Sequence, residues 1–263
     1  MTCLRTEDVS FKAGGRTLVD RVSLVCKSRQ FVALLGANGA GKSSLIRMLT
    51  GLVSPTAGTI LLDDRTVQSF HRREMARRRA YIPQNARVEW PIAVERLVAL
   101  GLMPQLPAFG DLDATAWCKV EVALRQCGLI HKRHQPADTL SGGELARAML
   151  ARALVGNPDI LIADEPLAGL DPRHAIEGMV QLAGLARAGR LVIASIHDLT
   201  LAARYATHVA ILHQGRLTAF GPTQTTLTPA NIRTAFEVNA RIAGVGTHAR
   251  IDLGVPAEPA GMR

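Results

Sequence analysis

A glycine-rich segment near residue 40 has the spacing of a phosphate-binding loop. Residues 36–43 read Gly-Ala-Asn-Gly-Ala-Gly-Lys-Ser, which matches the pattern G-x-x-x-x-G-K-S/T. In such a loop, glycines let backbone N–H groups surround phosphate oxygens, and the positive end of the following helix points at them. We expect the Lys42 ammonium group to reach the β- and γ-phosphates and the Ser43 hydroxyl to hold Mg²⁺. The segment therefore predicts a site for a nucleoside triphosphate.

Two adjacent carboxylates follow an apolar segment later in the chain. Residues 160–163 read Ile-Leu-Ile-Ala and are followed directly by Asp164 and Glu165. Because adjacent residues of a strand point to opposite sides, the two acids are expected to have different tasks. Asp164 is predicted to hold Mg²⁺, and Glu165 to orient and deprotonate an attacking water. Together with the phosphate-binding loop, the pair predicts hydrolysis of the nucleotide.

A second predicted anion site begins at Ser141. Residues 140–144 read Leu-Ser-Gly-Gly-Glu and open a segment with helical periodicity. Ser141 can cap that helix, and the paired glycines expose backbone N–H groups beside its positive end. The simpler interpretation is a capped helix without a ligand. The phosphate-binding loop in the same chain favours a second phosphate contact.

The elements around these residues predict a mostly parallel α/β sheet. Residues 31–35 form an apolar run of strand length before the phosphate-binding loop, and residues 44–50 continue with helical periodicity. Apolar runs of the buried-strand type recur at 160–163 and 191–195, with a helix expected at about 173–188. Buried runs that alternate with helices imply a parallel sheet covered on both faces.

Two further segments extend this core. Residues 4–25 have strand-like segments around the turn Gly14-Gly15-Arg16, which predicts an N-terminal antiparallel hairpin. Residues 93–156 are mostly helical and resemble an insertion within one folded unit. No internal repeat or linker separates these parts, so we expect a single domain.

The composition leaves several partners open. The 263 residues carry 31 Lys and Arg against 22 Asp and Glu, a formal net charge of +9. A basic chain can bind nucleic acid, anionic lipid or nucleotide phosphates, so the charge alone decides nothing. The densest basic cluster is at 71–79, where helical spacing predicts a solvated helix face. The sequence contains no stretch of 18 apolar residues that is free of charged side chains, so no membrane-spanning helix is expected.

Taken together, the motifs resemble those of the nucleotide-binding subunits of ATP-binding cassette (ABC) transporters, over essentially the whole chain. The Leu-Ser-Gly-Gly-Glu signature occurs in few other proteins. The matches, in the family's order, are Walker A at 36–43, the Q-loop glutamine at Gln84, the signature at 140–144, Walker B at 160–165, the D-loop at 168–171 and the switch histidine at His197.

The resemblance implies a P-loop NTPase fold. Its parts would be a RecA-like core with a parallel sheet, an N-terminal antiparallel β subdomain and an inserted helical subdomain. We expect one ATPase domain over residues 1–222, with the core in about 1–83 and 152–222 and the helical subdomain in about 84–151. Residues 223–263 would form a short C-terminal tail.

The resemblance also implies a head-to-tail dimer with two ATP molecules at its interface, each between Walker A of one copy and the signature of the other. Glu165 and His197 would be catalytic, with His197 contacting the γ-phosphate, and Asp171 would reach across the interface. The expected ligands of Mg²⁺ are Ser43, Gln84 and Asp164. The expected nucleotide contacts are Gly36, Ala37, Asn38, Gly39, Ala40, Gly41, Lys42, Ser43, Ser44, Gln84, Ser141, Gly142, Gly143, Glu144 and Asp171.

Four stretches resemble importers of iron siderophores, haem and cobalamin, namely 76–84, 94–101, 197–206 and 215–222. The signature ending in Glu144 is similar to that of haem importers, which favours haem over a ferric siderophore or cobalamin. The implied partners are a second copy of the chain, two copies of a transmembrane permease and an extracytoplasmic solute-binding protein, but no nucleic acid. The subunit would lie at the cytoplasmic face of the inner membrane. The permease would dock around 84–102, where Trp90 is either a groove lip or a core residue.

A soluble ABC ATPase that acts on nucleic acid or the ribosome is the alternative from another class. A DNA-repair cassette would place a long coiled coil between Walker A and the signature, whereas Ser141 follows Lys42 by only 99 residues. A translation-associated protein would carry two cassettes. Two positions depart from the family pattern. The signature usually ends in Gln where this chain has Glu144, and the usual adenine-stacking aromatic is replaced by Ala13, with Phe11 nearby.

Overall fold

The computed structural model describes residues 1–84, 86–107 and 112–256. A six-stranded sheet forms its centre, in the order β10-β9-β3-β8-β7-β6. All neighbouring strands in it are parallel except the pair of β9 and β10. The predicted, mostly parallel sheet is therefore confirmed. Its strands are β3 (Phe31–Leu35), β6 (Arg79–Ile82), β7 (Ile160–Ala163), β8 (Leu191–Ser195), β9 (His208–His213) and β10 (Arg216–Pro222).

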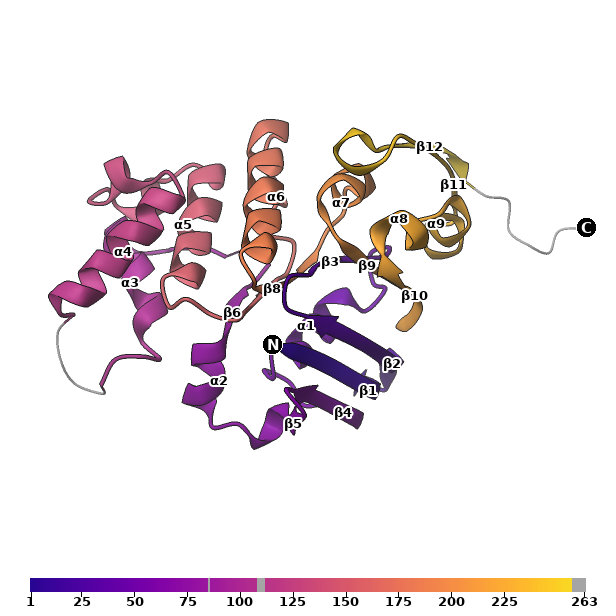
Figure 1. Cartoon of the computed structure of the whole chain (residues 1–263), viewed down its shortest axis with the longest axis horizontal. Coiled ribbons are helices and arrows are strands. Elements are labelled where there is room, and N and C mark those ends of the chain that lie inside the picture. Colours follow the sequence, from indigo (N-terminus) through magenta and orange to yellow (C-terminus); the bar gives the residue numbers. More distant parts are fainter. Residues whose placement is uncertain (85, 108–111, 257–263) are drawn as a thin grey trace, which may run out of the picture.

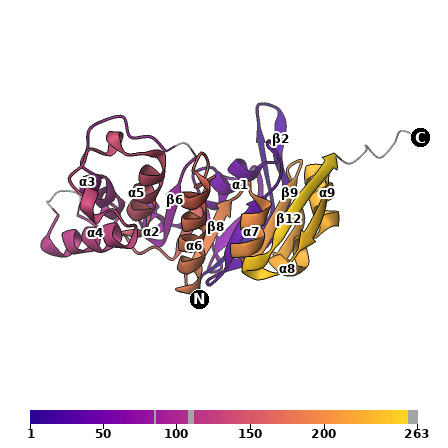
Figure 2. The same ribbon diagram turned by 90° about the horizontal axis from the view of Figure 1, so that it is seen from above.

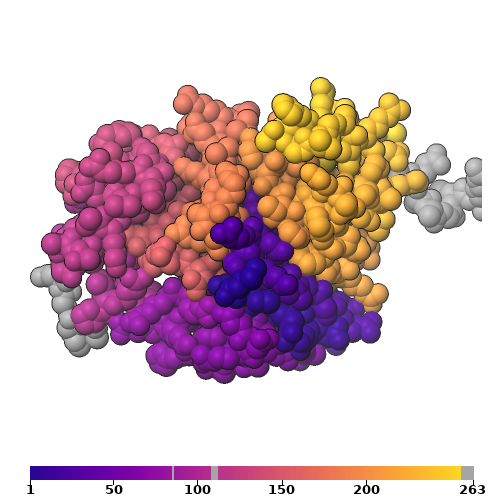
Figure 3. All heavy atoms as spheres, in the orientation of Figure 1, coloured from indigo at the N-terminus to yellow at the C-terminus, as the bar shows by residue number. Residues whose placement is uncertain are grey.

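A second, antiparallel sheet contains the N-terminus and lies below the rest of the molecule in Figure 3. Its order is β2-β1-β4-β5. The strands are β1 (Cys3–Ala13), β2 (Arg16–Lys27), β4 (Ala57–Leu62) and β5 (Arg65–Thr66). The hairpin predicted around residues 14–16 is confirmed, because Gly14 and Gly15 adopt positive φ values of 56° and 74° between β1 and β2.

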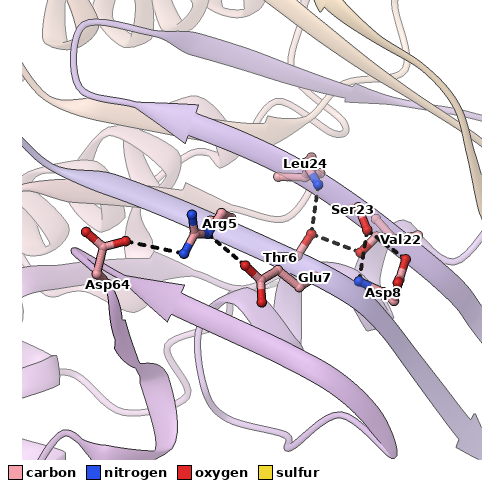
Figure 4. Close-up of polar contacts among 8 residues, drawn as sticks. All are labelled: Arg5, Thr6, Glu7, Asp8, Val22, Ser23, Leu24 and Asp64. Carbon is pink, nitrogen blue, oxygen red and sulfur yellow. Dashed lines mark hydrogen bonds and ion pairs between the residues drawn. The ribbon is translucent and has the colours of Figure 1, made fainter.

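The pairing of β1 with β2 is interrupted by a bulge between Thr6 and Val9, where side chains supply hydrogen bonds (Figure 4). The buried Thr6 hydroxyl accepts a hydrogen bond from the Leu24 N–H and donates one to the Val22 carbonyl, both at 3.0 Å. Two residues further on, the Asp8 N–H donates to the Ser23 hydroxyl at 2.8 Å. The side chains thus replace ladder bonds where the strands change register, and a bulge of this kind bends the strand.

Helices cover both faces of the central sheet (Figure 1). Val32 and Leu34 of β3 pack in a cluster with residues of α1 and the antiparallel sheet, while Phe31, Ala33 and Leu35 face the opposite cluster with residues of α6, α7 and α9. This alternation explains why β3 is apolar at every position. The helices are α1 (Lys42–Leu49), α2 (Arg72–Arg78), α3 (Val94–Ala99), α4 (Ala114–Gln126), α5 (Gly142–Leu154), α6 (Pro172–Arg187), α7 (Leu199–Tyr205), α8 (Thr223–Thr226) and α9 (Pro229–Phe236).

Helices α3, α4 and α5 pack on one another at one end of the molecule, beyond the β6 edge of the sheet (Figures 1 and 2). At the other end, residues 223–256 form α8, α9 and the hairpin of β11 (Val238–Ala243) with β12 (Arg250–Pro256). Ile232 and Ile251 of this segment are buried in the core. For this segment the sequence predicted only a short C-terminal tail, without helices or strands. Every helix in the described ranges is too short or too polar to cross a membrane.

Candidate functional site

The glycine-rich loop connects β3 to α1, as the sequence predicted. Gly36 and Gly41 have positive φ values of 148° and 100°. A Cβ atom at Gly36 would lie 2.4 Å from the Leu212 carbonyl oxygen, and one at Gly41 would lie 2.4 Å from the Leu18 carbonyl oxygen. Both positions therefore require glycine for the backbone angle and for the close approach of neighbouring main chains.

The Lys42 side chain lies inside this loop. Its ammonium group donates to the carbonyl oxygens of Gly36 at 2.7 Å and Ala37 at 3.0 Å. Burial lowers the pKa of Lys42, and the nearby carboxylates of Glu165 and Asp164 act in the opposite direction. The cation is thus held next to the loop and in the field of the two acids, where a polyphosphate would meet it.

The two adjacent carboxylates have different surroundings, as predicted, but the cause differs from the prediction. Strand β7 ends at Ala163, and Glu165 adopts a left-handed φ of 50° beyond it. Asp164 is 2% exposed, whereas Glu165 lines an open cleft. Strand alternation therefore does not separate the two acids. The left-handed backbone at Glu165 does so.

Ser195, at the end of β8, holds this turn and was not predicted as a site residue. Its hydroxyl donates to Asp164 Oδ1 at 2.8 Å and accepts from the Glu165 N–H at 2.6 Å. Ser195 is fully buried. Only its position at the end of an apolar run could have suggested such a role, because its partners lie some 30 residues earlier in the chain.

Substitution of Ser195 by alanine should destabilise the protein without blocking the cleft. It leaves the buried Asp164 carboxylate and the Glu165 N–H without their shared partner, which costs about 1–3 kcal/mol of unfolding free energy. Urea unfolding measures this loss. Ser69→Ala is the control, since its exposed hydroxyl donates only to the Thr66 carbonyl. Equal stability of the two variants would contradict the role of Ser195.

Glu165 is held by two further side chains. Gln84 Nε2 donates to Glu165 Oε2 at 2.7 Å, and His197 Nε2 lies 2.6 Å from Glu165 Oε1. The three residues follow β6, β7 and β8, three neighbouring parallel strands whose carboxyl ends share one edge of the sheet. All three residues were predicted as site residues from the sequence, but the contacts among them were not.

These side chains and the loop border one cleft of about 450 Å³. Leu18 of β2 also lines it and was not predicted. The residues that line the cleft are Leu18, Asn38, Gly39, Gly41, Lys42, Ser43, Ser44, Gln84, Glu165 and His197. The remaining loop residues, Gly36, Ala37 and Ala40, lie in the same β3–α1 connection without lining it.

The expected Mg²⁺ ligands have the right donor chemistry. Ser43 supplies a hydroxyl, Asp164 a carboxylate and Gln84 an amide oxygen, all hard oxygen donors. In the described ranges no group of three or more His, Cys, Asp or Glu residues is arranged to hold a metal on its own. Mg²⁺ is commonly bound by one or two carboxylates together with substrate phosphates. The donor set therefore suits a metal that arrives with a nucleotide.

The signature segment forms a capped helix N-terminus. The Ser141 hydroxyl accepts from the Glu144 N–H at 3.4 Å, and the Ser141 N–H donates to Glu144 Oε2 at 2.9 Å, which together make a capping box at the start of α5. Glu144 Oε1 also pairs with Lys132 at 2.6 Å. Hydrogen bonds from Lys132 and Ser141 lower the pKa of Glu144 to about 2. Both carboxylate oxygens are thus bound within the chain, which leaves the helix N-terminus to Gly142 and Gly143.

Glu144→Gln should keep the capping box and lose the ion pair to Lys132. Because folding depresses the Glu144 pKa from 4.5 to about 2, its charge stabilises the fold above pH 4.5 and stops doing so as the pH falls towards 2. We expect the variant to be at most about 1 kcal/mol less stable at pH 7, with the gap closing below pH 4. Thermal unfolding at several pH values measures this. A gap that widens in acid would contradict the assignment.

The signature and the D-loop do not line the cleft in one copy of the chain. None of residues 141–144 borders it, and neither does Asp171. Asp171 caps α6 by accepting from the His174 N–H at 3.1 Å, and its other oxygen lies 2.5 Å from His174 Nδ1. The structure thus brings together the loop, Gln84, Glu165 and His197 in this cleft, and residues 141–144 and Asp171 do not line it. Gly142 and Gly143 instead border a separate hollow, which Glu165 also lines.

The two candidates for adenine stacking also lie outside the cleft. Phe11 is half-buried and packs against the cluster that contains α1, and Ala13 is exposed at the end of β1. Leu18, on the paired strand, is the apolar side chain that borders the cleft.

A family comparison agrees with this geometry. Residues 19–168, which contain the loop, the signature and the two carboxylates, match the family model described as ABC transporter. The chain belongs to the ABC transporter family. The resemblance drawn from the motifs and the P-loop NTPase fold are thereby confirmed.

Among its relatives in this family is the hemin import ATP-binding protein HmuV of Rhodopseudomonas palustris (strain BisA53). It is 39% identical over 252 residues, which cover 92% of this chain and 91% of the relative. An ABC transporter described as of the metal-chelate type, solved in an inward-facing conformation, superposes with a TM-score of 0.83 at 21% identity and covers 98% of this chain and 99% of that one. The dimeric cassette MJ0796 has a TM-score of 0.73 at 24% identity and covers 84% and 98%. These two likenesses concern the fold.

Proposed function

We propose that the chain is the ATP-hydrolysing subunit of a membrane importer for hemin. The observation that carries this proposal is the 39% identity, over nearly the full length of both chains, to a protein named for hemin import. The nucleotide cleft supports the ATPase part of the proposal, because it joins a phosphate-binding loop to a carboxylate held at the carboxyl edge of the sheet.

In this proposal the loop binds the triphosphate. The backbone N–H groups of residues 36–43 and the positive end of α1 hold phosphate oxygens. Lys42 exchanges its loop carbonyl partners for β- and γ-phosphate oxygens, which accept stronger, charge-assisted hydrogen bonds. Ser43, Asp164 and Gln84 would hold Mg²⁺, which neutralises charge on the phosphates when it is bound.

Glu165 then acts as the general base. It accepts a proton from a water molecule while the water oxygen attacks the γ-phosphorus, and the bond from that phosphorus to the bridging oxygen of ADP breaks. His197 orients the Glu165 carboxylate through its 2.6 Å contact and contacts the γ-phosphate. The left-handed backbone at Glu165 directs the carboxylate towards the loop.

We further propose a head-to-tail homodimer. The signature residues Ser141, Gly142 and Gly143 form an anion-binding helix start that does not border the cleft of its own chain. In the dimer this helix start would complete the cleft of the other copy, and Asp171 would lie at the same interface. In this proposal, residues 1–222 form the ATPase domain, and residues 84–151 within it form the helical subdomain. Residues 223–263 form the C-terminal segment.

The proposed membrane partner is a pair of permease subunits that receive hemin from an extracytoplasmic solute-binding protein. Trp90 is 62% exposed, which excludes it from the core and favours a docking role. Leu100 and Met103 are also exposed, and they lie directly after α3, whereas Trp90 lies shortly before it in the chain. The subunit would sit at the cytoplasmic face of the inner membrane, and no nucleic acid is needed as a partner.

Growth of a deletion strain under iron limitation tests the solute. With hemin as the sole iron source we expect growth to stop, and with a ferric siderophore we expect it to continue. Restoration by the intact gene, but not by a Glu165→Gln copy, would tie growth to hydrolysis. Normal growth on hemin would overturn the hemin assignment. Growth loss on the siderophore or on cobalamin-dependent medium instead would assign the importer to that chelate.

A further inference from the structure

A hollow distinct from the nucleotide cleft lies where α2, β6, the short helix η2 (Leu100–Leu102) and the end of α5 meet. Its volume is about 280 Å³, and it shares no lining residue with the nucleotide cleft. We call it the arginine pocket, because Arg77, Arg79 and Arg152 line it and no carboxylate among the described residues does. Two of these arginines come from the basic cluster at 71–79.

The prediction of a solvated helix face holds for only part of that cluster. Arg72, Arg73 and Arg77 of α2 are exposed, but the helix ends at Arg78, and Arg79 begins β6 as a half-buried residue. The helical spacing of the basic residues extends to Arg79, although the helix itself ends one residue earlier. Arg79 is therefore drawn into the protein at the edge of the pocket.

The acids near the cluster are already paired with other arginines. Asp63 and Asp159 both bind Arg78, at 2.6 and 3.0 Å, and Glu74 binds Arg65 at 3.0 Å. Within the described ranges no ion pair forms with any of the three pocket arginines. Their positive charge is left without a counter-charge from the chain.

Burial increases the cost of that charge. The Arg79 Nε is buried and has no hydrogen-bond partner in the described structure. Burial alone lowers the pKa of Arg79 to about 10 and lowers that of Arg152, with no carboxylate acting against it. Both guanidinium groups stay protonated at neutral pH, so the pocket keeps buried donors and positive charge that an anion would satisfy.

Helix dipoles account for part of this arrangement only. Arg77 and Arg152 lie in the last turns of α2 and α5, where a cation is favourable. Arg79 lies in a strand, and its Nη2 atom lies next to Gly51, just beyond the C-terminal end of α1, yet its buried Nε has no hydrogen-bond partner in the described structure. Arg77 also donates from Nε to the Pro104 carbonyl at 2.8 Å, which fixes its guanidinium group at the rim.

We propose that the arginine pocket binds a phosphate group. Guanidinium groups present several N–H donors in a fixed fork, and the tetrahedral oxyanion offers enough acceptors for more than one of them. The phosphate group can come from inorganic phosphate in solution or from the headgroup of an anionic lipid. In either case it binds outside the nucleotide cleft.

Calorimetric titration of the full chain with inorganic phosphate tests the proposal, at constant ionic strength and with Lys42→Ala as the background to remove phosphate binding at the loop. We expect saturable binding that weakens at least about tenfold in Arg79→Gln/Arg152→Gln, because each lost charge-assisted hydrogen bond lowers the affinity for phosphate by about a factor of ten or more. Arg125→Gln/Arg173→Gln is the control with the same charge change, since both residues form exposed pairs.

A vesicle flotation assay distinguishes the two sources. Binding to phosphatidylglycerol vesicles, but not to phosphatidylcholine vesicles, that is lost in the pocket variant would assign a lipid headgroup. Phosphate binding lost in that variant would assign the free anion. Should the double variant misfold by circular dichroism, Arg77→Gln replaces it, because Arg77 is exposed. Absence of both kinds of binding, or an equal loss in the control, would overturn the proposal.

Discussion

Glu165→Gln should bind ATP normally and hydrolyse almost none of it. The substitution keeps the size of the side chain and an oxygen that can accept from Gln84, so the cleft retains its shape. An amide cannot take the proton from water, however, and loss of a general base typically lowers the rate by about 10²–10⁴. In the proposed dimer, ATP should then stay bound between the two copies, because the step that would separate them is missing.

Three measurements on purified protein check this expectation: phosphate release, nucleotide affinity and mass by analytical ultracentrifugation with ATP. Glu177→Gln is the matched control, because Glu177 forms an exposed pair with Arg173 on α6. We expect a dimer with ATP for Glu165→Gln alone. Full turnover by this variant would refute the assignment of Glu165, and a monomer at saturating ATP would refute the dimer.

Lys42→Ala should lose nucleotide binding before any effect on chemistry can be seen. The Lys42 ammonium group is buried in the loop and donates hydrogen bonds to two backbone carbonyl oxygens. Phosphate oxygens of ATP would replace these carbonyl oxygens as acceptors. A charge-assisted hydrogen bond of this kind contributes about 1.5–3 kcal/mol, so the loss of even one should raise the dissociation constant for ATP about tenfold to a hundredfold.

Fluorescence titration with a labelled ATP analogue measures this change. Lys119→Ala removes the same charge from the exposed surface of α4 and should leave the affinity unchanged. The thermal midpoint of Lys42→Ala should stay close to that of the parent chain in the absence of nucleotide and no longer rise when ATP is added. Unchanged ATP affinity would argue against the phosphate-binding loop.

The parts of the site that were predictable from sequence are those in which chemistry and local backbone coincide. The loop at 36–43 needs glycine at fixed positions, because neighbouring main chains come so close that a Cβ atom would collide with their carbonyl oxygens. This requirement is visible directly in the spacing of the glycines. The carboxylates of Asp164 and Glu165 were also predictable, because they directly follow the apolar run of β7 in the sequence. Each motif is contiguous, so no knowledge of distant contacts is needed.

The parts that could not be predicted depend on contacts between distant segments. Ser195 reaches Asp164 only because β7 and β8 are neighbours, and Leu18 borders the cleft only because β2 passes the loop. Lys132 orients Glu144 from a short helix before the signature. The helical spacing at 71–79 wrongly predicted a helix at Arg79, because the pairing of Arg79 with Ile160 of the neighbouring strand overrides local periodicity.

The backbone angle at Glu165 places activity and thermostability in opposition. A left-handed conformation costs a residue with a side chain about 1–2 kcal/mol, whereas asparagine or glycine tolerates it better. Replacement by such a residue would relieve this strain and remove the proposed base at the same time. A directed-evolution screen that rewards heat resistance alone is therefore expected to discard this glutamate, and a screen that also demands turnover is expected to retain it.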